Sequence, residues 1–366
     1  MANLLQVPLA GNECLGEQMI FRGSWRHGAV FASLVSCALL AAACVAPAPV
    51  GVVPAGQPGA VGPCSFERTD LVNDQDWRHP VFVLEPTGSA APYTGGTCDD
   101  DERPVVLLAH GYLGNIYEGY QGLIEQLVSN GYVVVFPGYT IEYSPDNQYK
   151  AVDTGFRQGV EFSKRADTSR IGFVGHSFGG GMVYWLIQQA DERGWGSEAI
   201  WAVNFAPYFA LMNPGDGPID LPDHIRFTMV SYDNDYFVDT RIAIEQFAAI
   251  DTPDEAAQHV GVFSDRSQSP AIEADHIGLV SVELLPGLGT VNTDHYDHWV
   301  AFRSIDATAR CAIDGRWCDT DLSYTGTWPD GTPVRPAVVR DDHSDFGPRP
   351  ALAECELALL NPRPCP

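Results

Sequence analysis

The chain has 366 residues, of which 45% are hydrophobic, so it is long enough and apolar enough for one large soluble core. Its formal net charge of −26 at pH 7 argues against nucleic acids and other anionic polymers as partners. The composition therefore favours neutral ligands, either small molecules or polymers.

The first 43 residues have the pattern of an export signal. Arg22 and Arg26 precede an apolar stretch at 29–45, which contains the small residues of a cleavage site. The stretch is short for a membrane span and is followed by prolines. Met19 is a natural start for such a signal, and we expect residues 1–43 to be removed on export.

Three alanines followed by Cys44 resemble a bacterial lipobox. This resemblance implies a lipid on the Cys44 sulfur and a cell-surface lipoprotein, and the alternative is plain secretion after cleavage nearby. Residues 44–63 are rich in Pro, Gly and Ala and indicate a flexible tether. Residues 64–366 are then expected to form one domain with a C-terminal tail.

The remaining cysteines also indicate export. Without Cys14, Cys37 and Cys44, six cysteines remain, an even number that is typical of an oxidising compartment. Fifteen pairings are possible. Proximity in the sequence favours Cys64–Cys98, Cys311–Cys318 and Cys355–Cys365, which would staple the start of the domain and its tail. Metal binding is the weaker interpretation, because no two of these cysteines have C-x-x-C spacing.

Apolar runs and helical periodicities alternate along the domain. Buried strands are predicted at 105–109, 132–136, 171–174, 200–203 and 227–230. Amphipathic helices are predicted at 120–128, 151–165, 182–190, 240–249 and 299–309. This alternation predicts the α/β class, with a mostly parallel sheet covered by helices on both faces.

Residues 175–179 match the pattern G-x-S-x-G, with Ser177 at its centre. The match lies between a predicted strand and a predicted helix. In that context the sharp turn strains the serine and lifts its hydroxyl clear of the sheet, as in a nucleophile elbow. The alternative is a Gly-rich turn that holds an ordinary serine. The context favours Ser177 as a nucleophile.

A serine nucleophile needs a base and an acid that orients the base. In enzymes with this turn, the acid and then the histidine follow the serine along the chain. The acid is expected after the second strand beyond the elbow, where Asp235 is our choice and Asp233 the alternative. The other interpretation of either residue is a solvated turn.

The base is expected near the end of the domain, on a loop after the last strand. His276 fits, because an alternating apolar segment at 271–275 leads into it. His295 and His298 are the rivals, and we expect them to cap the last helix instead. Their H-x-x-H spacing also suits a metal, but no third ligand accompanies it, so we predict neither metal nor cofactor.

The oxyanion of an acyl-transfer intermediate needs two backbone N–H donors. One is expected from Phe178, the residue after the nucleophile. The other is expected from Tyr112, in the Gly-containing loop 109–114 that follows the first central strand.

Residues 80–276 resemble the lidless esterase branch of the α/β-hydrolases. This branch includes bacterial cutinases and polyester hydrolases, chlorophyllases and platelet-activating-factor acetylhydrolases. The resemblance rests on residues 105–112, 131–135 and 175–180. It implies an α/β-hydrolase fold and a serine esterase that hydrolyses neutral small-molecule or polymeric esters.

Two further segments look like polyester hydrolases. Residues 206–208 are Ala-Pro-Tyr where those enzymes have Ala-Pro-Trp, and Asn234-Asp235 resembles the pair that holds their catalytic acid. The resemblance implies that Tyr112 and Tyr208 form facing aromatic walls for the substrate, and the alternative is packing in the core or rim.

The chain also departs from that family. Phe178 replaces a methionine that is usual in polyester hydrolases and matches the acetylhydrolases better. Residues 278–298 and the tail beyond Cys311 have no clear counterpart, and either could cover the cleft. Two other functions stay open: a non-catalytic surface lipoprotein on a hydrolase scaffold, and an exported serine peptidase or perhydrolase with the same triad.

Overall fold

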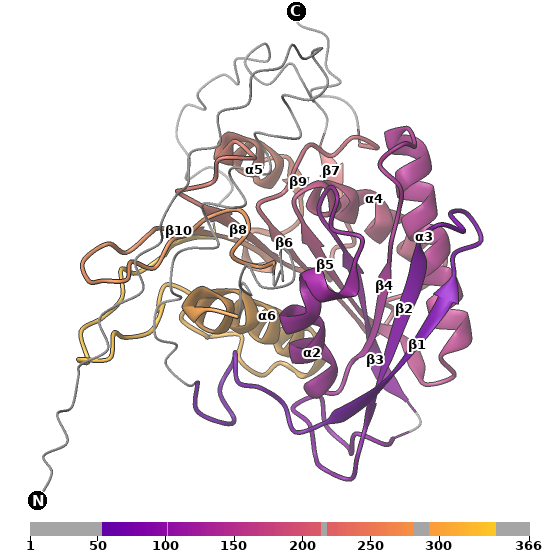
Figure 1. The fold of residues 1–366 in the computed structure, drawn as a ribbon, viewed down its shortest axis with the longest axis horizontal. Helices are drawn as coiled ribbons and strands as arrows, with labels where there is room; N and C mark the ends of the chain where they lie inside the picture. Colours follow the sequence, from indigo (N-terminus) through magenta and orange to yellow (C-terminus); the bar gives the residue numbers. More distant parts are fainter. Residues whose placement is uncertain (1–52, 101, 214–217, 281–292, 342–366) are drawn as a thin grey trace, which may run out of the picture. The chain divides into compact units, whose positions relative to one another are not determined.

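A nine-stranded sheet lies at the centre of the fold (Figure 1). The computed structural model describes residues 53–100, 102–213, 218–280 and 293–341. The strands occur in the order β1-β2-β4-β3-β5-β6-β8-β10-β11. Their bounds are β1 Ser65–Val72, β2 Pro80–Thr87, β3 Arg103–Ala109, β4 Val133–Pro137, β5 Ala166–His176, β6 Ala199–Phe205, β8 Arg226–Tyr232, β10 Ala257–Val262 and β11 Val338–Arg340.

Every neighbouring pair from β4 to β10 in this order is parallel. The antiparallel pairs lie at the two ends of the sheet, where β1 pairs with β2, β2 with β4, and β10 with β11. A separate pair of two-residue strands, β7 (Ile219–Asp220) and β9 (Ile250–Asp251), is parallel. The predicted α/β class with a mostly parallel sheet is therefore confirmed.

Helices cover both faces of this sheet (Figure 1). Buried side chains of α2 and α6 cluster on one face, and those of α3, α4 and α5 on the other. The bounds are α2 Gln121–Ser129, α3 Pro145–Phe162, α4 Phe178–Glu192, α5 Thr240–Phe247 and α6 Arg303–Asp314. Short helical turns are η1 Tyr117–Tyr120, η2 Asp254–Ala256 and a π-helical turn at Asp297–Phe302 that leads into α6.

Strand periodicity explains the two layers. Successive side chains of a strand point to opposite faces. Val106 and Leu108 of β3 accordingly join the cluster of α2 and α6, whereas Val105 and Leu107 join the cluster of α3 and α4. Each parallel strand thus contributes to two cores, which is why these strands read as continuous apolar runs.

The direction of winding reverses at β3. From this strand the chain crosses to β4 on one side and then returns to β5 on the other side. In open α/β sheets, ligands bind at such a switch point, outside the carboxyl ends of the strands. The loops that follow β3 and β5 are therefore the expected place for a site.

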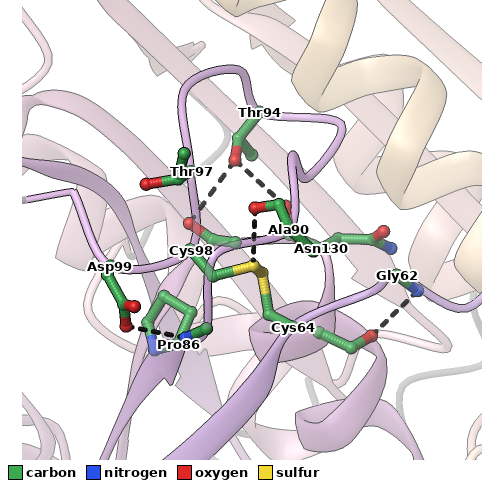
Figure 2. Close-up of a disulfide and its surroundings, with 12 residues drawn as sticks. Gly62, Cys64, Pro86, Ala90, Thr94, Thr97, Cys98, Asp99 and Asn130 are labelled. Atoms are coloured by element: carbon green, nitrogen blue, oxygen red, sulfur yellow. Dashed lines mark hydrogen bonds between the residues drawn. A yellow bond between two sulfur atoms is a disulfide. The ribbon is translucent and has the colours of Figure 1, made fainter.

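Two of the three favoured disulfides are present. Cys64, directly before β1, is bonded to Cys98 in the loop between β2 and β3, with a Cα–Cα distance of 5.6 Å (Figure 2). Cys311 of α6 is bonded to Cys318 just beyond the end of that helix, with a Cα–Cα distance of 4.7 Å. Both predictions are confirmed, and both bonds suit an oxidising compartment.

Some predictions concern residues outside the described ranges. These are the export signal at 1–43, the lipid on Cys44, and the pair Cys355–Cys365. Within the described part of the chain, no helix combines the length and the apolar content that a membrane span requires.

Residues 53–63 are packed against the domain, although the sequence indicates a flexible tether there. Val53 and Ala60 are buried and form a small cluster with Trp299. The amide of Gly59 donates a 2.8 Å hydrogen bond to the Asp306 carboxylate of α6. A Cβ at Gly59 would lie 2.3 Å from the carbonyl oxygen of His298, so only glycine permits this close approach.

The burial of Asp306 should make stability depend on pH. Burial raises the pKa of Asp306 to about 7. A carboxyl with a raised folded-state pKa holds its proton more tightly when folded, so its stabilising contribution is full below about pH 4 and is lost as pH rises through 7. Asp306→Asn lacks this titrating carboxyl. Between about pH 4 and 7 its free energy of unfolding should therefore fall less steeply with pH than that of the wild type, by on the order of 1 kcal/mol per pH unit.

Urea unfolding at pH 5, 6, 7 and 8 measures this difference. The amide oxygen of the variant can still accept from Gly59, so the packed segment is retained. Asp330→Asn is the control, because hydrogen bonds from Thr332 lower the pKa of the Asp330 carboxyl and place its titration below this range. Parallel stability curves for wild type and Asp306→Asn would contradict the prediction.

Candidate active site

Ser177 is the single residue between β5 and α4, on a strained turn. Its backbone angles are φ 55° and ψ −121°, a region that residues other than glycine rarely adopt. The Ser177 amide donates to the carbonyl of Phe205 at 2.9 Å. Its own carbonyl accepts from the amides of Gly181 and Tyr208. These bonds hold the strained backbone in place.

Close approach explains two glycines of the motif. A Cβ at Gly179 would lie 2.1 Å from the carbonyl oxygen of Ala109, at the end of β3. A Cβ at Gly175 would lie 2.5 Å from the side chain of Val183 on α4. The glycines therefore let strand, turn and helix pack together.

The structure brings Ser177, His276 and Asp235 into one line of hydrogen bonds. The Ser177 Oγ is 2.8 Å from His276 Nε2, and His276 Nδ1 is 2.7 Å from Asp235 Oδ2. The three residues follow β5, β10 and β8, respectively. The side chains of His276 and Asp235 are only 8% and 2% exposed, so water competes little for these bonds.

The Asp235 carboxylate fixes the tautomer of His276. Its other oxygen, Oδ1, accepts from the amides of Phe237 and Val238, each at 2.8 Å. A carboxylate can only accept, so His276 Nδ1 carries the proton and Nε2 can accept the hydroxyl proton of Ser177. The arrangement can therefore activate a serine for nucleophilic attack.

The alternative candidates for the acid and the base have other partners. Asp233 accepts from the amide and the hydroxyl of Ser264. His295 Nε2 is 2.7 Å from the carbonyl of Thr325, and the His298 ring packs on Phe302. Among the described residues, no group of three or more His, Cys, Asp and Glu side chains could hold a metal.

Phe178 and Tyr112 supply two amides at the switch point of the sheet. Phe178 is the first residue of α4, where the N–H groups of a helix have no partner within the helix. Neither of the two amides donates to an acceptor among the described residues. The rings of Tyr112 and Phe178 meet edge to face at 5.8 Å, so the loop after β3 contacts the start of α4.

Aromatic side chains surround this position. Tyr208 is half-buried, and its ring centre lies 6.0 Å from that of Phe178. Burial raises the pKa of Tyr208 to about 12, so it stays neutral. Tyr112 is 47% exposed. Both tyrosines thus contact Phe178, while facing walls across a substrate remain a prediction.

Sequence reasoning missed three residues around the site. Phe237, which is about half exposed, packs against the His276 ring with 5.3 Å between ring centres. His176 and Tyr120 are buried and hydrogen-bonded to each other. His176 lies inside the G-x-S-x-G motif, and that position was the only local signal for it.

Three carboxyls interact electrostatically near the loop of His276: Asp275 directly precedes His276 in the chain and acts on Asp294 and Asp297, with Asp297 the most buried of the three. Burial raises the pKa of Asp275, the residue before His276, and raises that of Asp294 to about 6. Burial, reinforced by Asp294, holds the pKa of Asp297 well above its ordinary value. These groups therefore add less negative charge beside the site than their number implies.

Comparison with known proteins gives no family: no family model matches the chain, and no curated protein does.

Proposed function

We propose that this protein is a serine esterase with an α/β-hydrolase fold, which hydrolyses neutral carboxylic esters through an acyl-enzyme. One observation carries the proposal: a serine on a strained strand–turn–helix is hydrogen-bonded to His276, which is hydrogen-bonded to Asp235. This combination is the geometry by which such triads are recognised.

The mechanism has two steps. The Ser177 Oγ attacks the ester carbonyl carbon while His276 Nε2 takes the hydroxyl proton. The amides of Tyr112 and Phe178 bind the oxyanion of the tetrahedral intermediate, and the Asp235 carboxylate stabilises the imidazolium. The imidazolium then gives its proton to the departing alcohol, which leaves an acyl group on Ser177. Water, deprotonated by His276, releases that acyl group as the acid and restores the serine.

Charge and surface favour a neutral ester. The net charge of −26 repels anionic substrates. Tyr112, which contacts Phe178, and Phe237, which contacts His276, are each about half exposed, so they offer apolar surface beside the nucleophile. Small-molecule and polymeric esters both suit this surface.

Two other functions are less well supported. A non-catalytic lipoprotein on this scaffold would have no need for the aligned Ser177, His276 and Asp235. A serine peptidase or perhydrolase would share them. A panel of p-nitrophenyl esters, peptides and polyester films separates these activities from ester hydrolysis.

Covalent labelling tests the nucleophile. A fluorophosphonate probe should add one phosphonyl group to the wild-type protein, at Ser177 by peptide mass spectrometry. Ser177→Ala should remain unlabelled and should not hydrolyse p-nitrophenyl esters, with an unchanged circular dichroism spectrum. Labelling at another serine, or turnover by Ser177→Ala, would refute the proposal.

We also propose that the protein is exported, as a surface lipoprotein anchored at Cys44 or as a secreted enzyme. Support comes from the two disulfides, which suit an oxidising compartment. Metabolic labelling with a fatty-acid analogue, compared in wild type and Cys44→Ala, separates the two forms.

A further inference from the structure

A buried hydrogen-bond network joins three loops of the candidate active site. The amide of Gly111 donates to the hydroxyl of Tyr120 at 2.8 Å. The Tyr120 hydroxyl is 2.6 Å from His176 Nδ1. His176 Nε2 is 2.8 Å from the backbone carbonyl oxygen of His276. Tyr120 and His176 are 1% and 3% exposed, so the network is shielded from water.

The partners fix the proton positions in this network. The His276 carbonyl can only accept, so His176 Nε2 carries a proton and donates it. In the neutral ring Nδ1 must then accept, which requires the Tyr120 hydroxyl to donate to it. The Tyr120 oxygen is left to accept from Gly111. All three hydrogen bonds are therefore satisfied with one arrangement of protons.

The surroundings keep His176 in this neutral form. Burial, reinforced by His276 beside it, holds the pKa of His176 well below its ordinary value. The titratable groups that face the ring are Tyr120, His276 and the buried His110. A proton on Nδ1 would leave the Tyr120 hydroxyl without its acceptor, so the network itself opposes protonation.

Each end of the network lies next to a residue of the proposed mechanism. Gly111 precedes Tyr112, His176 precedes Ser177, and the carbonyl belongs to His276 itself. The loop after β3 also packs closely on the network. A Cβ at Gly111 would lie 3.1 Å from His176 Nδ1, and one at Gly114 would lie 2.8 Å from the Tyr120 ring.

We infer that Tyr120 and His176 are positioning residues, which hold the loop of the base and the loop of the oxyanion donor in register with Ser177. This role rests on the proposed function. Other hydrogen bonds also hold the loop of His276. The Asn234 amide donates to the Ala274 carbonyl, and the Ser264 hydroxyl accepts from the Ala274 amide. The network acts at the His276 backbone, next to the imidazole that must meet Ser177.

Tyr120→Phe tests the role, because it removes one hydroxyl and keeps the ring. With p-nitrophenyl butyrate we expect kcat to fall about 10- to 100-fold with little change in KM, since misplaced groups slow the chemistry more than binding. Tyr184→Phe is the matched control. Tyr184 is fully buried on α4 and donates at 3.0 Å to Gln246, outside the network. It should keep the wild-type kcat.

A double-mutant cycle tests whether the two residues act together. His176→Phe removes both ring nitrogens and should lower kcat at least as much as Tyr120→Phe. Tyr120→Phe in addition to His176→Phe should cost clearly less than Tyr120→Phe alone, because only the hydrogen bond from Gly111 to Tyr120 is then left to lose. Additive losses, or an unchanged kcat in Tyr120→Phe, would overturn the positioning role.

Nitrogen-15 NMR of the full-length protein gives a readout that needs no activity. His176 should show a proton on Nε2 alone, and Tyr120→Phe should shift the Nδ1 resonance, because that nitrogen loses its hydrogen-bond donor while the His276 carbonyl still holds the proton on Nε2. A wild type labelled by fluorophosphonate but insensitive to Tyr120→Phe would overturn the inference and leave the proposed function standing. A wild type with the expected tautomer but no labelling would overturn the proposed function and, with it, the role of the network.

Discussion

Replacing His276 by alanine should lower kcat for ester hydrolysis by about 10⁶. The Ser177 hydroxyl is a weak nucleophile unless a base takes its proton, and His276 Nε2, at 2.8 Å, is the base that the geometry offers. The backbone carbonyl of residue 276 remains, so its hydrogen bond from His176 is retained. Stopped assays with p-nitrophenyl butyrate, with Ser177→Ala as the background, measure the loss.

His298→Ala is the control for His276. The His298 ring packs on Phe302 and lies where Gly59 approaches the domain. Its loss should lower the melting temperature and leave kcat within about twofold of wild type. If His298→Ala were inactive and His276→Ala active, the base would be misassigned.

The sequence predicts the central strands well, because they are buried on both faces and therefore read as unbroken apolar runs. The outer strands carry weaker signals. Every residue of β1 is exposed or half-buried, and its sequence alternates irregularly. In β10 the apolar run is broken by His259 and Gly261, and β11 has three residues. The pairing of β10 with β11 also joins segments that are distant in the sequence.

The residues of the candidate site also differ in how strongly the sequence indicates them. Ser177 has a local signal, since its turn is encoded by adjacent glycines and by the strand and helix beside it. Asp235 and His276 follow from their order along the chain, and the sequence left Asp233, His295 and His298 as alternatives. The partners of His176 lie 56 and 100 residues away, so nothing local could identify its network.

The packed segment 53–63 shows a different limit. Its Pro, Gly and Ala content indicates flexibility, yet glycine also permits close approach. The hydrogen bond from Gly59 to Asp306 joins residues that are 247 positions apart in the sequence, so amino-acid composition cannot indicate it.

Asp235→Asn should lower kcat by about 10⁴ with little change in KM. The amides of Phe237 and Val238 need an acceptor, so the amide oxygen of the variant should take the place of Oδ1. Its NH₂ group then faces His276 Nδ1. Because NH₂ only donates, the proton of the imidazole must move to Nε2, which can no longer accept from Ser177. The side chain is 2% exposed, so substrate binding should change little.

Asp233→Asn is the matched control, because it makes the same chemical change two residues earlier in the same turn. Its carboxylate oxygen Oδ1 accepts from the Ser264 amide and hydroxyl, and an amide oxygen can still accept there. We expect kcat within a few-fold of wild type, together with a modest loss of stability. Equal losses of kcat in the two variants would mean that both acids only hold the turn. A larger loss in Asp233→Asn would transfer the orienting role to Asp233. A loss confined to Asp235→Asn would show that the tautomer of His276, rather than the fold of the loop, limits the chemistry.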